Sequence, residues 1–145
     1  MDDHARDLWQ QGEELLGIGE KTSALGAFVD AAIADEQCGR HERALVAWQA
    51  IARRFGVTGH LLERCARLSE RLGLDPDTYV FWVAAAALYK QHGMPREAHV
   101  ATTHALILRE EERMPHANPG RPGPKLAMDV LLDAQHRELV IDLLW

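Results

Sequence analysis

The sequence has little of what usually marks a function class. Its two cysteines in 145 residues, Cys38 and Cys65, form no close-spaced pair, which excludes a disulfide scaffold and predicts reduced thiols in a cytoplasmic protein. The most apolar stretch, YVFWVAAAALY at residues 79 to 89, has eleven residues, whereas a membrane-spanning helix needs about 20. The acidic start lacks the apolar core of a signal peptide. We therefore expect no membrane span and no membrane partner.

Signs of catalysis are missing as well. There is no G-x-S-x-G sequence and no glycine-rich phosphate loop. None of the eight histidines forms the i, i+4 pair that places two imidazoles on one helix face for a metal. We expect no enzyme activity, no cofactor and no metal site.

Charge is unevenly distributed along the chain. The net charge of −6 argues against a nucleic-acid partner. Residues 1 to 40 hold nine acids and three bases, whereas residues 41 to 75 hold four acids and six bases. Arg64, Arg67 and Arg71 share one helix face. This face is either only solvated, with Glu63 and Arg67 as an i, i+4 ion pair, or it binds an acidic partner, such as the N-terminal helix of a second copy.

Strand signals are almost absent, and the apolar periodicity is helical throughout. Glycines mark the breaks, and Asp75 before Pro76 predicts a capped helix start. Four prolines between residues 113 and 125 exclude a helix there. We expect an all-α repeat domain over 1–112, a Pro/Gly-rich linker over 113–125 and an apolar C-terminal helix over 126–145. The predicted helices are 3–17, 21–37, 41–55, 59–72, 76–92, 95–112 and about 125–144.

Residues within these helices recur at matching spacings. The best set is Trp82, Ala85, Ala86, Tyr89, Gly93, Ala98 and Ala105; a second is Phe28, Ala31, Ala32, Gly39, Ala44, Trp48 and Ile51; a third is Leu8, Gly12, Leu15, Gly19, Ala24, Phe28 and Ala31. Together they resemble a tetratricopeptide array over roughly residues 5 to 112. Asp35 departs from it, because it stands where the pattern has tyrosine. The spacings of 20 and 54 between corresponding alanines also depart from multiples of 34, and the alternative is a generic all-α bundle.

The resemblance implies stacked helical hairpins that act as a protein-interaction adaptor, with a partner segment bound in a groove along the first helix of each repeat. An amphipathic helix would suit such a groove. Alternatively, Val80 and Val83 are ordinary core residues. The implied groove positions are Val80, Val83, Ala84, Ala87, Lys90 and Gln91, together with Val29, Asp30, Ile33, Glu36 and Gln37.

The C-terminal segment carries more apolar surface than a free tail should. It could dock in the groove of its own chain, exchange between two copies as in a homodimer, cap the repeat array, or begin a further domain. A homo-oligomeric structural or regulatory subunit is therefore the alternative function, which a concentration-dependent size would identify. The docking residues we expect are Leu131, Leu132, Leu139, Val140, Leu143, Leu144 and Trp145.

Overall fold

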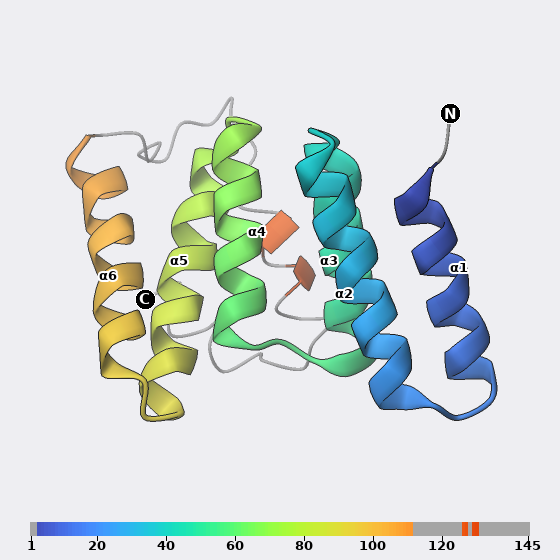
Figure 1. Cartoon of the computed structure of the whole chain (residues 1–145). Helices are drawn as coiled ribbons and strands as arrows, with labels where there is room; N and C mark the ends of the chain where they lie inside the picture. Colours follow the sequence, from blue (N-terminus) through green and yellow to red (C-terminus); the bar gives the residue numbers. More distant parts are fainter. Residues whose placement is uncertain (1–2, 112–125, 128, 131–145) are drawn as a thin grey trace. The chain divides into compact units, whose positions relative to one another are not determined.

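The described residues of the computed structural model are 3–111, 126–127 and 129–130, and they contain helices but no strand (Figure 1). The all-α prediction is therefore confirmed for this part of the chain. The predicted linker and the docking residues from Leu131 onward lie outside the described residues. The helices are α1 (His4–Gly17), α2 (Lys21–Gln37), α3 (His41–Phe55), α4 (Gly59–Arg71), α5 (Asp75–Gln91) and α6 (Pro95–Glu110).

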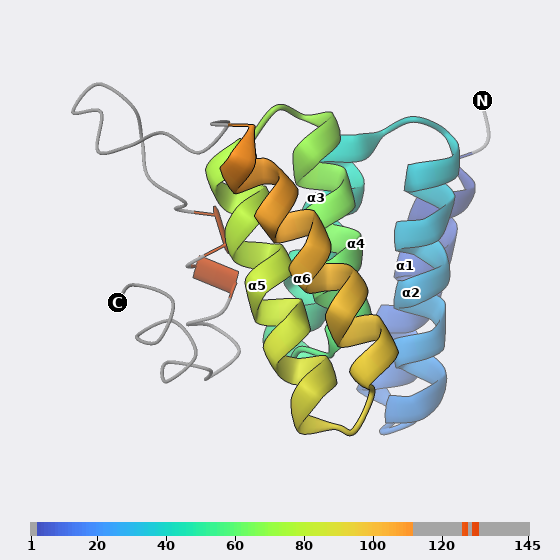
Figure 2. The ribbon, with the colours of Figure 1, turned by 90° about the vertical axis from the view of Figure 1, so that its left-hand side faces the viewer.

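The chain forms two compact units, which we call unit 1 (Met1–Phe55) and unit 2 (Gly56–Trp145). In unit 1 the middle helix α2 packs against both α1 and α3, and in unit 2 the middle helix α5 packs against both α4 and α6, as Figure 2 shows for α5 and α6. A helix with neighbours on two sides needs apolar residues around most of its circumference. This is why the most apolar stretch of the sequence, residues 79 to 89, lies in α5.

The helices within each unit are connected by turns of the same type. At the end of α1 the N–H of Gly19 donates to the carbonyl of Leu16 at 3.1 Å and that of Glu20 donates to Leu15 at 2.9 Å, the pairing of a Schellman motif. Gly19 has a φ of 85°, which favours glycine. The carbonyl of Glu20 then accepts from Ala24 at 2.9 Å and opens α2, so one residue ends one helix and begins the next. The same turn recurs at Gly39, Gly73 and Gly93.

This shared turn corrects one prediction. Asp75 was expected to cap α5, but Asp75 is the first helical residue, and Leu74 is the N-cap without a side-chain hydrogen bond. The reason is that Leu74 closes the preceding helix and starts the next one, which leaves no separate capping residue. A side-chain cap occurs instead after the different α3–α4 connection, where the Leu61 N–H donates to Thr58 Oγ1 at 3.1 Å.

The two units repeat each other at a shift of 54 residues. The bounds of α2 and α5 differ by this shift at both ends, and so do the turn glycines Gly19 and Gly73. The residues of unit 1 that are identical 54 positions later are Leu8, Gly19, Val29, Ala31, Ala32, Gln37, Gly39, Ala44, Val46 and Ala47. The chain therefore contains two versions of one three-helix unit.

Small residues on the first helix of each unit let a buried ring approach its backbone. A Cβ added to Gly12 would lie 2.7 Å from the ring of Phe28, and one added to Gly59 would lie 2.6 Å from the ring of Tyr89. Phe28 and Tyr89 are both buried, so the rings fill the space between helices. None of the helices among the described residues is both long and apolar enough to cross a bilayer.

Candidate functional site

A cavity of about 510 Å³ opens on unit 1 between α1 and α3, with α2 beneath it. Its volume is in the range of ligand-binding clefts. Small alanines line much of it, whereas Trp9 and Val46 stand at its sides; Val46 is 60% exposed. We call this cavity the unit 1 groove. Its lining residues are Ala5, Arg6, Trp9, Gln10, Glu13, Ala31, Asp35, Arg43, Val46, Ala47 and Ala50.

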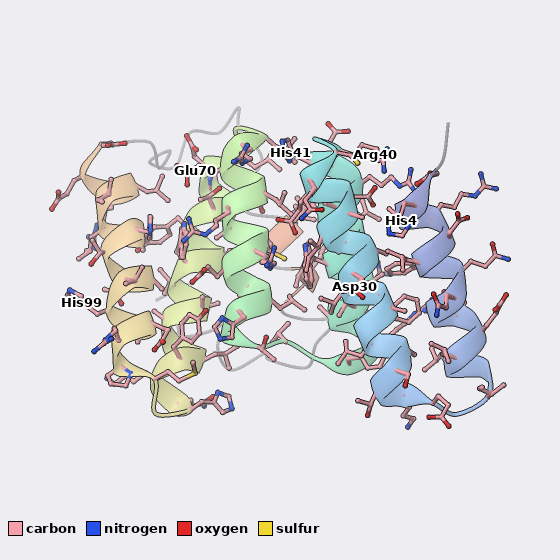
Figure 3. All side chains as sticks on the ribbon, viewed as in Figure 1. His4, Asp30, Arg40, His41, Glu70 and His99 are labelled. Carbon is pink, nitrogen blue, oxygen red and sulfur yellow. The ribbon has the colours of Figure 1, made fainter. Side chains whose placement is uncertain are left out.

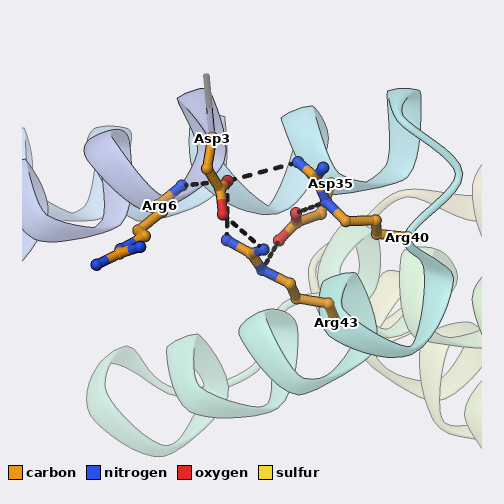
Figure 4. A network of polar contacts seen from close by, with 5 residues as sticks. All are labelled: Asp3, Arg6, Asp35, Arg40 and Arg43. Carbon is orange, nitrogen blue, oxygen red and sulfur yellow. Dashed lines mark hydrogen bonds and ion pairs between the residues drawn. The ribbon is translucent and has the colours of Figure 1, made fainter. Parts of the chain in front are cut away.

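A charged network borders the groove and ties the three helices together (Figure 4). The buried carboxylate of Asp35, on α2, accepts from Arg40 Nε at 2.8 Å and pairs with Arg43 Nε at 3.4 Å. Arg43 Nη1 also lies 2.8 Å from Asp3 Oδ2, just before α1. The hydrogen bond from Arg43 lowers the pKa of Asp3, and the backbone N–H of Arg6 lowers it further. Figure 4 shows the Arg6 side chain pointing away from the other four residues.

An aromatic and charged cluster borders the groove on α1. The rings of Trp9 and Phe28 lie 4.4 Å apart between centroids, and the guanidinium of Arg54 lies 5.2 Å from the Phe28 ring centre. Arg54 Nη1 pairs with Glu13 Oε1 at 2.8 Å. The Glu13 carboxylate and the Asp35 carboxylate are thus both neutralised by arginine, while the wall between them stays apolar.

The equivalent positions of unit 2 are occupied by rings. Tyr89 stands 54 residues after Asp35, and its buried ring covers Gly59. Its hydroxyl hydrogen-bonds His60 Nδ1 at 3.0 Å and Glu63 Oε1 at 3.2 Å, and burial, followed by the Glu63 charge, raises the pKa of Tyr89. His104, the counterpart of Ala50, stacks on Trp82 at 4.2 Å. At these two positions unit 1 has the shorter Asp35 and Ala50 where unit 2 has rings.

The predicted groove residues lie on α2 and α5, and the unit 1 groove includes none of them. Val80 and Ala84 are buried, and Val83 and Ala87 are half-buried. Lys90 and Gln91, at the end of α5, are exposed, as are Asp30 and Gln37 on α2. The other predicted positions on α2, Val29, Ile33 and Glu36, are half-buried. The two sets belong to different units, and a single groove shared by them stays a prediction.

The predicted basic face on α4 is exposed at all three arginines, Arg64, Arg67 and Arg71. Arg67 Nε lies 3.5 Å from Glu63 Oε2, as the i, i+4 spacing indicates, and its guanidinium lies 5.2 Å from the Trp82 ring centre. Arg67 therefore has a packing role beside its charge. An acidic partner for this face stays a prediction.

The start of the predicted C-terminal helix contacts unit 2. Residues 126–127 and 129–130 are helical, and Ala127 and Val130 are fully buried. The N–H of Ala127 donates to Asp77 Oδ1 at 2.9 Å, in the first turn of α5. Asp77 is buried too, and this burial raises the pKa of its carboxyl. The contact between Asp77 and Ala127 therefore anchors this segment to unit 2.

The raised pKa of Asp77 makes a pH prediction. A carboxyl whose pKa is higher in the folded state contributes stability at acidic pH and loses it as the pH rises through that raised pKa. Asp77→Asn cannot ionise but keeps an oxygen for the Ala127 N–H. We therefore expect the stability of Asp77→Asn relative to the natural chain, measured by urea unfolding, to increase as the pH rises from about 4, the ordinary pKa of an aspartate, through the raised pKa of Asp77. Asp77→Ala should lose hydrogen-exchange protection at Ala127, and a pH-independent difference for Asp77→Asn would contradict the assignment.

In the described part of the chain, no three side chains of His, Cys, Asp or Glu lie together so that they could bind a metal ion. His99 is exposed on the outer side of α6 (Figure 3), whereas the ring of His104 is stacked on Trp82. Cys38 is exposed and Cys65 is buried, and neither forms a disulfide.

Comparison with known proteins adds no assignment: no family model matches this chain, and no curated protein and no solved structure matches it. The site must therefore be interpreted from its own geometry.

One spacing recurs along the helices that form the unit 1 groove. Trp48, Ile51, Ala52 and Phe55 on α3 have the same spacing as Trp82, Ala85, Ala86 and Tyr89 on α5. Leu8, Gln11, Gly12 and Leu15 have it on α1, and Phe28, Ala31, Ala32 and Asp35 have it on α2. The spacing therefore marks each of the three helices around the groove, but it does not tell which of them line it.

Proposed function

We propose that this protein is a non-catalytic interaction adaptor that binds a segment of a partner protein in the unit 1 groove. The observation that carries the proposal is the groove itself: about 510 Å³ between α1 and α3, with an alanine-rich lining and exposed Val46 at its side. A concave apolar surface bordered by charged groups suits the apolar face of a peptide helix, with polar contacts at the rim.

The tetratricopeptide resemblance supports the adaptor function but implies a groove along α2 and α5. The residues that line the unit 1 groove come mainly from α1 and α3. The proposal therefore keeps the adaptor function and moves its site from α2 and α5 to α1 and α3.

The 54-residue repeat supplies a matched test. Val46 and Val100 are equivalent, both exposed, and only Val46 lines the groove. Peptides selected against the full chain from a displayed random library should bind Val46→Gln about tenfold more weakly, which corresponds to roughly 1.4 kcal/mol of lost apolar contact. Val100→Gln should bind them as the natural chain does. Calorimetry measures both, and the neutral glutamine leaves the charge network unaltered.

The proposal is wrong if selected peptides bind both variants equally, or if Val100→Gln is the variant that loses binding. A homo-oligomeric subunit with an exchanged C-terminal helix remains the second candidate. The contact between Ala127 and Asp77 holds the beginning of the segment on unit 2 of the same chain, which favours docking in cis over exchange.

A further inference from the structure

Unit 2 shows what the unit 1 groove lacks. In unit 2 rings of the chain itself occupy the positions that correspond to two groove residues: Tyr89 lies over Gly59, and His104 stacks on Trp82 with the planes 8° apart. The counterparts of Tyr89 and His104 in unit 1 are Asp35 and Ala50, and both line the open groove.

The two units can be compared in this way because their helices are joined alike. The turns at Gly39 and Gly93 have the same hydrogen bonds and φ values of 77° and 69°, so α3 and α6 begin at the same point after the middle helix. Ala50 and His104 are eleven residues after these glycines. A shared turn and a shared helix register place them at equivalent points of their units.

The chemistry of the groove favours a neutral ring over an ion. Asp35 is already paired with Arg40 and Arg43, and Glu13 is paired with Arg54, so a charged ligand group would compete with existing ion pairs. Trp9 offers an aromatic wall, and aromatic pairs attract each other beyond the burial of their area. Arg6, which also lines the groove, can contact the face of a ring.

We infer that the unit 1 groove binds an aromatic side chain (Phe, Tyr or Trp) of the partner segment, which takes the place that the chain's own rings take in unit 2. This inference rests on the proposed function and specifies the anchor residue of the ligand. An aromatic anchor in a preformed pocket is also the usual centre of binding energy in protein interfaces.

The test uses the isotope-labelled full chain and two probes, N-acetyl-tyrosine amide and N-acetyl-leucine amide. We expect the tyrosine probe to shift the NMR signals of the Trp9 indole N–H and of the Val46 and Ala50 methyl groups, and to bind at least several-fold more tightly than the leucine probe. Ala50→His introduces the ring that His104 has in unit 2, and it should weaken binding of the tyrosine probe by about tenfold. Glu42→His, on the exposed side of α3, is the control and should have no effect.

Equal binding of the two probes would overturn the aromatic anchor while the Val46 and Val100 comparison could still support the adaptor function. The absence of shifts at Trp9 would overturn it as well. Trp145 is the last aromatic residue of the chain. If the single substitution Trp145→Ala increases the affinity for the tyrosine probe, the groove is occupied by the chain's own C-terminus. The inference of a partner is then wrong. Should Ala50→His not fold, Ala50→Leu fills the same space and is expected to block the probe too.

Discussion

Replacing Asp35 by alanine is expected to lower the free energy of unfolding by about 2–3 kcal/mol. Its buried carboxylate accepts from Arg40 at 2.8 Å and pairs with Arg43 at 3.4 Å, and Arg43 also holds Asp3 ahead of α1. Alanine would leave both guanidinium groups beside a buried gap. The loss stays below that of a fully buried pair because the side chains of Arg40 and Arg43 are 35% and 43% exposed and can take up water.

The control for this prediction is Asp30→Ala, on the same helix but exposed. It removes the same charge without a buried ion pair, so we expect a change within about 0.5 kcal/mol. Urea unfolding at neutral pH, followed by circular dichroism, compares the two variants. Similar losses for Asp35→Ala and Asp30→Ala would show that the network in Figure 4 does not stabilise unit 1.

The helices of this protein could be predicted closely because local signals fix them. The apolar stripes of α1 to α5 each end at a glycine that adopts a positive φ, as at Gly19 and Gly73, and the expected ranges follow these glycines. The cap at Asp75 was wrong because one residue, Leu74, serves two helices, which depends on hydrogen bonds that composition does not reveal.

The location of the groove could not be predicted from the same signals. The turns before and after α2 are alike, so local sequence does not tell whether α2 pairs mainly with α1 or with α3; in the structure it packs against both. The groove also exists because some side chains, Ala50 above all, are too small to fill the space between α1 and α3. A space left unfilled by small side chains produces no periodic pattern in the sequence. Asp35 departs from the tyrosine pattern in the sequence, but the two arginines that it shares with Asp3, Arg40 and Arg43, come together with both carboxylates only through the packing of three helices.

Replacing Gly12 by alanine is expected to destabilise the protein by about 1–2 kcal/mol, although alanine favours helices. The new Cβ would lie 2.7 Å from Cε1 and 2.8 Å from Cδ1 of Phe28. That ring is fully buried, with Trp9 at 4.4 Å and Phe55 at 6.1 Å between centroids, so it cannot move without displacing its neighbours. Overpacking of this kind costs about 1–3 kcal/mol, against a gain of about 1 kcal/mol from helix propensity.

Gly26→Ala gives the opposite sign from the same chemical change, and so isolates the effect of the ring. Gly26 lies in the interior of α2, is exposed, and has nothing within 4 Å of an added Cβ, so the propensity gain of about 0.5–1 kcal/mol is uncompensated. Thermal and urea unfolding should place the natural chain between the two variants. If Gly12→Ala were as stabilising as Gly26→Ala, α1 and α2 could not pack as closely as the contact between Gly12 and Phe28 requires. The unit 1 groove, which α1 and α3 form over α2, would then lose the rigid floor on which its aromatic anchor depends.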